Sequence, residues 1–190
     1  MTLTKTTFRK KCLNKLQNAP EHNKLYKNHL LNNKLLKILS KNKNKKILLY
    51  YPLPIEANIL NTLKQMRKIS EVYIPFMEGQ SFKMVSFRLP LKKKKFGIYE
   101  AGNTHKKINK IDIAIIPAVG VDGNLQRVGF GKGMYDRFFE KLQKKPYTIF
   151  VQNELCFTQE TICDDYDISC DLLLTPTSRP IMASMVKKRK

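Results

Sequence analysis

The densest group of chemically capable residues lies between Arg127 and Arg137, where the sequence reads RVGFGKGMYDR. Three glycines occupy alternate positions in this segment, and glycine lets backbone N–H groups approach an anion closely. Arg127 and Lys132 supply full positive charges beside them. A helix predicted to begin at about Gly133 adds the positive end of its dipole. The segment is therefore predicted to bind phosphate groups.

Two widespread phosphate-binding motifs do not describe this segment. A P-loop has the pattern G-x-x-x-x-G-K-[ST], but here Gln126 replaces the first glycine and Gly133 replaces the hydroxyl residue. A dinucleotide fingerprint has the pattern G-x-G-x-x-G, and Met134 holds the place of its last glycine. The glycines could instead form only a tight turn. The cations and the adjacent Tyr135 and Asp136 favour a ligand-binding loop over that alternative.

The pattern R-x-G-x-G-x-G-x-Y-D-R resembles the 5-formyltetrahydrofolate cyclo-ligase family, also called methenyltetrahydrofolate synthetase. Weaker matches extend the resemblance over nearly the whole chain. The resemblance implies an ATP-dependent ligase of folate one-carbon metabolism that forms a C–N bond. Such an enzyme uses ATP and Mg²⁺ to phosphorylate the formyl oxygen of 5-formyltetrahydrofolate, with or without a polyglutamyl tail. Cyclisation then gives 5,10-methenyltetrahydrofolate, ADP and phosphate.

The resemblance also implies an ATP site. The family carries the pattern K-x-x-[apolar]-R near its N-terminus as part of this site, and Lys5 and Arg9 fit it around Phe8. Like charges four residues apart share a helix face and are mildly destabilising unless an anion lies between them, although an exposed basic face is the simpler explanation. Arg127 and Lys132 are the implied catalytic cations. The residues implied for ATP binding are Lys5, Arg9, Arg127, Gly129, Phe130, Gly131, Lys132, Gly133, Met134 and Tyr135.

The implied substrate-binding residues are Tyr51, Glu56, Met84 and Tyr135. Glu56 matches a glutamate that the family places just after a strand, and its carboxylate could accept hydrogen bonds from the amino and ring N–H groups of a pterin. A glutamate in the first turn of a helix is also explained by the helix dipole alone. Met84 is the nearest match to a methionine of the folate pocket, although it could equally be a core residue.

Asp136 and Asp167 are the carboxylates that the resemblance implies for Mg²⁺, which takes one or two carboxylates together with phosphate oxygens and water. For Asp136, stabilisation of a helix N-terminus is the alternative. Met134 and Ala118 depart from the family, which usually has tyrosine and glycine there, and Tyr166 stands in place of a histidine. The changes at Met134 and Ala118 remove no charge, so we expect them to alter substrate affinity more than activity.

Alternating helices and short apolar strands must position these residues. Apolar spacing predicts helices over residues 3–18, 22–40, 56–66 and 133–143, with a further short helix before Asp167. Apolar runs between turn residues predict strands over residues 47–51, 72–75, 83–88, 111–116, 147–151 and 172–175. This order predicts an α/β fold, a three-layer α/β/α sandwich with a Rossmann-like, largely parallel sheet. We expect a single domain over residues 1–190, with a basic tail at about residues 186–190.

The formal net charge of +21 raises a different hypothesis, a basic α/β protein that binds nucleic acid without catalysis. That hypothesis predicts aromatic residues among basic ones, for which Phe96 and Tyr99 after the lysines at 92–95 are the only hint. However, 29 of the 36 basic residues are lysines, scattered among many asparagines. This distribution indicates a compositional bias. We therefore expect a small-molecule substrate and no specific nucleic-acid partner.

The remaining features predict a cytoplasmic monomer. No apolar run approaches the ~20 residues needed to cross a bilayer, and the N-terminal segment lacks the apolar core of a signal peptide. The three histidines follow no metal-ligand spacing. The four cysteines, Cys12, Cys156, Cys163 and Cys170, include no C-x-x-C pair and are predicted to be reduced, partly buried thiols.

Overall fold

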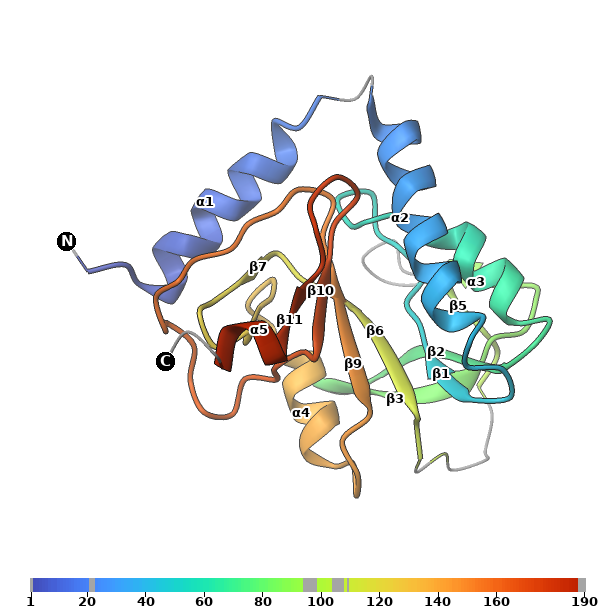
Figure 1. The fold of residues 1–190 in the computed structure, drawn as a ribbon. Coiled ribbons are helices and arrows are strands. Elements are labelled where there is room, and N and C mark those ends of the chain that lie inside the picture. Colours follow the sequence, from blue (N-terminus) through green and yellow to red (C-terminus); the bar gives the residue numbers. More distant parts are fainter. Residues whose placement is uncertain (1, 21–22, 94–98, 104–107, 109, 188–190) are drawn as a thin grey trace.

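A sheet of seven strands forms the centre of the molecule. The computed structural model describes the chain except for residues 1, 21–22, 94–98, 104–107, 109 and 188–190. The strands of this sheet are β1 (Lys46–Leu48), β2 (Glu71–Glu78), β3 (Ser81–Ser86), β6 (Ile113–Pro117), β9 (Tyr147–Val151), β10 (Leu172–Leu174) and β11 (Ile181–Met182). Their order across the sheet is β11-β10-β9-β6-β1-β2-β3 (Figure 1).

The central strands run parallel, and one antiparallel strand closes each edge. Ile47 of β1 lies opposite Val72 of β2 on one side and Ile113 of β6 on the other. β6 pairs in parallel with β9, and β9 pairs in parallel with β10. The edge strands β3 and β11 are antiparallel to their neighbours. The expectation of a largely parallel sheet is confirmed.

Helices cover both faces of the sheet because the parallel strands are apolar on both sides. Every residue of β6 is buried. Ile113 and Ile115 face one core, which includes residues of α2 (Lys24–Leu39) and α3 (Leu60–Met66). Ala114 and Ile116 face a second core with residues of α4 (Met134–Glu140) and α5 (Ala183–Lys187). Figure 1 shows these helix pairs on opposite sides of the sheet, as the predicted three-layer sandwich requires.

Helix α1 (Lys5–Gln17) belongs to a third, smaller core. The side chain of Thr4 caps its N-terminus by accepting a hydrogen bond from a backbone N–H of the first turn. Phe8 and Cys12 are the buried residues of this helix, and they pack in a cluster with Val128.

The prediction of four reduced cysteines is wrong, because Cys12 and Cys156 form a disulfide. These positions are 144 residues apart in the chain, so no local spacing in the sequence indicates the pair. Cys163 and Cys170 are free. The disulfide joins α1 to the loop that follows β9.

Two predicted helices also differ from the structure. Glu56 lies in a turn before α3, which begins only at Leu60. The Glu56 carboxylate closes this turn by accepting a hydrogen bond from the N–H of Leu53. No helix lies between β9 and β10, a stretch that the structure describes completely. The remaining strands are β4 (Lys92–Lys93), β5 (Tyr99–Glu100), β7 (Gly120–Val121) and β8 (Arg127–Val128).

The C-terminal end of the chain is described up to Lys187 in α5. Most of the predicted basic tail, residues 188–190, lies outside the described residues. Among the helices that the structure describes, none is both long enough and apolar enough to cross a membrane.

Candidate functional site

A cavity of about 300 Å³ opens at the carboxyl edge of the sheet. β1 and β6 are neighbours there, but the chain leaves β1 toward β2 on one side and returns to β6 on the other. Parallel α/β sheets bind ligands at such a switch point. The cavity is lined by Tyr50, Tyr51, Leu53, Glu56, Pro75, Met77, Phe82, Tyr99, Arg127, Phe130, Lys132, Gly133, Met134 and Tyr135.

Aromatic rings form much of the cavity wall. The rings of Tyr51 and Tyr99 have centroids 5.0 Å apart, and Phe82 and Tyr135 form an edge-on pair at the same separation. Such walls suit a flat heteroaromatic ring system. Tyr99 thus lines the cavity, whereas Phe96 lies outside the described residues.

Glu56 supplies a carboxylate to this cavity. Its Oε2 accepts a hydrogen bond of 2.9 Å from the N–H of Leu53. Burial raises the pKa of Glu56 by disfavouring the charged form, while the Leu53 N–H and the charge of Arg127 act in the opposite direction. A carboxyl group with a raised pKa beside a guanidinium in a cavity is a candidate for ligand contact.

Arg127 is only 6% exposed although it is charged. Its Nε donates a hydrogen bond of 2.8 Å to the carbonyl of Pro117, and its guanidinium carbon lies 4.8 Å from the centroid of the Tyr135 ring. Burial lowers the pKa of Arg127, whereas Tyr135 and nearby carboxylates, including Asp136 and Glu56, raise it. The guanidinium stays charged at neutral pH, so the cavity contains a fixed cation.

The glycines of the segment are required for two different reasons. A Cβ at Gly129 would lie 2.3 Å from Nη1 of Arg127, so only glycine lets the guanidinium pack against the backbone. Gly131 and Gly133 have φ values of 95° and 56°, a left-handed conformation that glycine adopts most easily. Gly129 is therefore fixed by a charged side chain, and the other two glycines by the path of the backbone.

Arg137 attaches the segment of residues 127–137, called here the glycine segment, to the hairpin of β2 and β3. Its Nε donates a hydrogen bond of 3.0 Å to the carbonyl of Gln80, and its Nη2 donates to the carbonyls of Gln80 and Lys132. The Lys132 side chain is exposed and lines the cavity, and Met134, the departure from the family pattern, lines it too. Arg137 has a positioning role that the sequence motif did not reveal.

The structure places Met84 away from the cavity surface. This side chain is 3% exposed in the core, and it pairs across the hairpin with Pro75, which does line the cavity. The methionine of this hairpin that lines the cavity is Met77 of β2. The sequence did not identify Met77, because only the register of the hairpin decides which methionine faces the ligand side.

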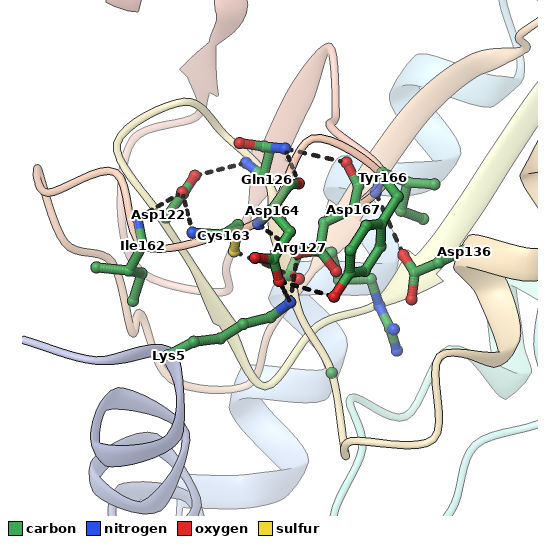
Figure 2. A network of polar contacts seen from close by, with 12 residues as sticks. Lys5, Asp122, Gln126, Arg127, Asp136, Ile162, Cys163, Asp164, Tyr166 and Asp167 are labelled. Atoms are coloured by element: carbon green, nitrogen blue, oxygen red, sulfur yellow. Dashed lines mark hydrogen bonds and ion pairs between the residues drawn. The ribbon is translucent and has the colours of Figure 1, made fainter.

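Helix α1 brings two further cations to the glycine segment. The Nε of Arg9 donates a hydrogen bond of 2.9 Å to the carbonyl of Gly129. Figure 2 shows Lys5 reaching from α1 to the carboxylates of Asp164, at 3.0 Å, and Asp167. Burial disfavours the Lys5 ammonium, but these hydrogen bonds outweigh it and the pKa of Lys5 is raised. The predicted common face of Lys5 and Arg9 is therefore turned toward the site.

Asp136 and Asp167 both line an open groove of about 910 Å³, which shares Gly133 with the cavity. Asp136 accepts a hydrogen bond of 3.2 Å from the N–H of Ile168, and Asp167 accepts one of 2.8 Å from the N–H of Asp164. Within the described part of the chain, no group of three or more His, Cys, Asp and Glu side chains is arranged to hold a metal ion. Asp136 and Asp167 fit the one or two carboxylates that Mg²⁺ takes alongside phosphate and water, and Asp167 is largely buried and also paired with Lys5.

Asp122 is a fully buried carboxylate that connects the turn before the glycine segment to the loop before β10 (Figure 2). Its Oδ1 accepts hydrogen bonds from the N–H groups of Asn124 at 3.0 Å and Gln126 at 2.8 Å. Its Oδ2 accepts hydrogen bonds of 3.1 Å from the N–H groups of Ile162 and Cys163. The start of the glycine segment is thereby joined to the loop before β10. In the sequence, Asp122 is simply the first residue of a turn.

Comparison with known proteins gives consistent matches. Residues 1–176 match the model of the 5-formyltetrahydrofolate cyclo-ligase family. The 5-formyltetrahydrofolate cyclo-ligase of Mycoplasma pneumoniae is 27% identical to this chain over 173 residues, which are 90% of this chain and 98% of that protein. The enzyme of the same name from Mycoplasma genitalium is 28% identical over 162 residues, which are 81% of this chain and 88% of that protein.

Two solved structures share the fold. The 5,10-methenyltetrahydrofolate synthetase of Aquifex aeolicus, determined by NMR, has a TM-score of 0.77 at 26% identity and covers 93% of this chain and 91% of its own. A 5,10-methenyltetrahydrofolate synthetase from Mycoplasma pneumoniae has a TM-score of 0.68 at 23% identity, over 92% of this chain and 99% of its own. Because the sequence identity to this second structure is only 23%, its similarity shows a shared fold alone.

Proposed function

Because this chain belongs to the 5-formyltetrahydrofolate cyclo-ligase family, we propose that it converts 5-formyltetrahydrofolate to 5,10-methenyltetrahydrofolate with ATP and Mg²⁺. One observation supports this most strongly. Arg9 of α1 contacts the glycine segment, and Arg127 and Lys132 of that segment line the same cavity as Glu56. Membership of an enzyme family also counts against the alternative of a nucleic-acid-binding protein without catalysis.

The reaction requires a phosphate site beside a pterin site. The formyl oxygen on N5 is a poor leaving group. Transfer of the γ-phosphoryl group of ATP to that oxygen gives ADP and an imidate phosphate. N10 then attacks the formyl carbon and loses its proton, and the C–O bond breaks to release inorganic phosphate. Phosphoryl transfer depends chiefly on positioning and on neutralisation of charge, which are the contributions expected of this protein.

The aromatic cavity is the proposed site of the pterin. The Glu56 carboxylate accepts hydrogen bonds from its amino and ring N–H groups, and Tyr51 and Tyr135 contribute to the walls around it. Met84 supports the wall indirectly, through its partner Pro75 on the neighbouring strand. These assignments make Glu56 the residue that orients the ring.

The glycine segment is the proposed site of the ATP phosphates. Arg127 and Lys132 neutralise phosphate charge from within the cavity, and Arg9 approaches from α1. Lys5 is paired with Asp164 and Asp167, so it holds their loop against α1 as well as adding charge. The backbone and side chains that complete this site are Gly129, Phe130, Gly131, Gly133, Met134 and Tyr135.

Asp136 and Asp167 are the proposed ligands of Mg²⁺. A Mg²⁺ ion held by these two carboxylates would supply positive charge that offsets the charge of the phosphate oxygens. We further propose that the protein acts as a monomer in the cytoplasm, where its proposed substrates are soluble metabolites.

An absorbance assay on the purified protein tests the proposal. The extended N5–C–N10 conjugation of the product gives a new near-ultraviolet band, and ADP release is measured in parallel. We expect the band only when 5-formyltetrahydrofolate, ATP and Mg²⁺ are all present. A folded protein that produces neither the band nor ADP would contradict the proposed reaction.

A further inference from the structure

Helix α1 is held to the body of the protein by a small surface. Phe8 and Cys12 are its buried residues, and both pack on the backbone of β7. A Cβ at Gly120 would lie 2.7 Å from Cε1 of Phe8 and 2.9 Å from Sγ of Cys12. Partly buried leucines and polar contacts complete this surface. A helix with so few buried residues is expected to open locally more readily than the central sheet.

The disulfide connects this helix to a point that is firmly fixed. The backbone N–H of Cys156 donates to Oε1 of Gln152 at 3.0 Å, and the N–H of Val121 donates to the carbonyl of Cys156 at 3.0 Å. Gln152 is 1% exposed and also donates to the same carbonyl at 3.1 Å. Cys156 therefore moves with the body of the protein, while its partner Cys12 moves with α1.

The position of α1 decides the position of Arg9. Arg9 lies three residues before Cys12, so the two side chains are neighbours along the helix. The guanidinium of Arg9 donates a hydrogen bond to the Gly129 carbonyl. It also lies close to Gly131, about 4 Å from the position that a Cβ would occupy there. Undocking of α1 withdraws this cation, and Lys5 with it, from the glycine segment.

We propose that Cys12 and Cys156 form a redox modification site, at which reduction by a dithiol loosens α1 and weakens binding of a nucleoside triphosphate. The second part of this inference rests on the proposed function. In the reaction, a thiolate of the dithiol attacks one sulfur and displaces the other cysteine as a thiolate. The second thiol of the reductant then closes its own disulfide and frees the remaining cysteine. Two electrons and two protons pass from the dithiol to Cys12 and Cys156.

The other cysteines do not compete in this exchange. Burial raises the pKa of Cys163, and burial raises the pKa of Cys170 to about 12. Both therefore remain protonated thiols near neutral pH, and the thiolate is the reactive form. Cys12 is completely buried and Cys156 is 6% exposed, so the reductant gains access only when α1 opens. A ligand that holds α1 closed should consequently slow the reduction.

Reduced and oxidised wild-type protein provide the test. Peptide mapping without reductant establishes whether Cys12 is joined to Cys156. Hydrogen exchange of α1 and calorimetric titration with ATP–Mg²⁺ are then measured before and after treatment with dithiothreitol. The double variant with Cys12→Ala and Cys156→Ala mimics the reduced form, and Cys170→Ala, which removes a buried free thiol, is the matched control.

We expect reduction to accelerate exchange in α1 and to raise the Kd for ATP by about tenfold, with Cys170→Ala unchanged. Bound ATP should slow reduction of the disulfide. Absence of the disulfide from the peptide map, or equal α1 exchange in both redox forms, overturns the inference. If neither form binds ATP, the proposed function fails, and α1 exchange alone then decides whether the disulfide controls docking. If α1 exchange responds but the ATP Kd does not, the link to the site is wrong.

Discussion

Single residues of the site divide into buried ions that hold its shape and exposed ions that are available to ligands. Arg127 and Asp122 are buried and bonded to backbone groups, so each would leave unsatisfied partners if removed. Lys132 is exposed on the glycine segment, where a lost charge disturbs little of the fold. Substitutions at these positions should therefore separate stability from binding.

Replacing Lys132 and Arg127 in turn tests this division. Lys132→Ala should weaken ATP binding while the unfolding free energy changes by less than about 0.5 kcal/mol. Arg127→Ala should weaken ATP binding and also lower stability by about 2 kcal/mol, because a buried hydrogen bond and the contact with Tyr135 are lost. Calorimetric titration and urea denaturation measure the two effects. Equal losses of stability in both variants would show that the division is incorrect.

The raised pKa of Glu56 predicts opposite pH trends for stability and for folate binding. The folded protein retains this proton above the ordinary carboxyl pKa of 4.5, so the Glu56 contribution to stability is present below that value and falls as pH rises through the raised pKa. Folate binding should strengthen over the same window, because the ionised carboxylate accepts the pterin hydrogen bonds. Glu56→Gln should remove both trends, whereas Glu140→Gln on the exposed side of α4 should keep them. Urea denaturation and folate titration at several pH values check this, and unchanged trends in Glu56→Gln would exclude the proposed role.

At the scale of elements, the sequence predicted those strands whose apolar character is uninterrupted. The strand Tyr147–Val151 has the predicted bounds, since it is buried on both faces between β6 and β10. β2 extends past Pro75, its predicted end. At Pro75 the strand has passed the end of β1 and pairs only with β3, so the N–H that proline lacks is not needed for pairing with β1. The disulfide and the hairpin register depend on contacts distant in sequence, so local patterns could not reveal them.

Element positions around the site depend on Asp122, which joins the glycine segment to the loop before β10. Asp122→Asn places a donor where the carboxylate accepted hydrogen bonds, so we expect a loss of about 3 kcal/mol in unfolding free energy. Hydrogen exchange should also increase in both joined segments. The exposed Asp165, changed to Asn, is the control from the same loop. Faster exchange in only one of the two segments would show that Asp122 does not couple them.

At the scale of the whole molecule, three cores hold three parts of one site. The core beneath α2 and α3 supports Tyr50 and the end of β1, and the core beneath α4 supports Phe82 and the glycine segment. The third core holds α1 and its cations over that segment. The net charge of +21 is not concentrated here, because Glu56, Asp136, Asp164 and Asp167 lie among the cations. The site is thus specified by the convergence of the cores and not by overall charge.

Isotope transfer from the substrate tests the proposed chemistry most directly. 5-Formyltetrahydrofolate carrying ¹⁸O in its formyl group is incubated with the enzyme, ATP and Mg²⁺, and the released inorganic phosphate is analysed by mass spectrometry. Phosphorylation of the formyl oxygen predicts one ¹⁸O atom in each phosphate, because the C–O bond breaks when N10 closes the ring. Unlabelled phosphate released together with 5,10-methenyltetrahydrofolate would contradict that mechanism.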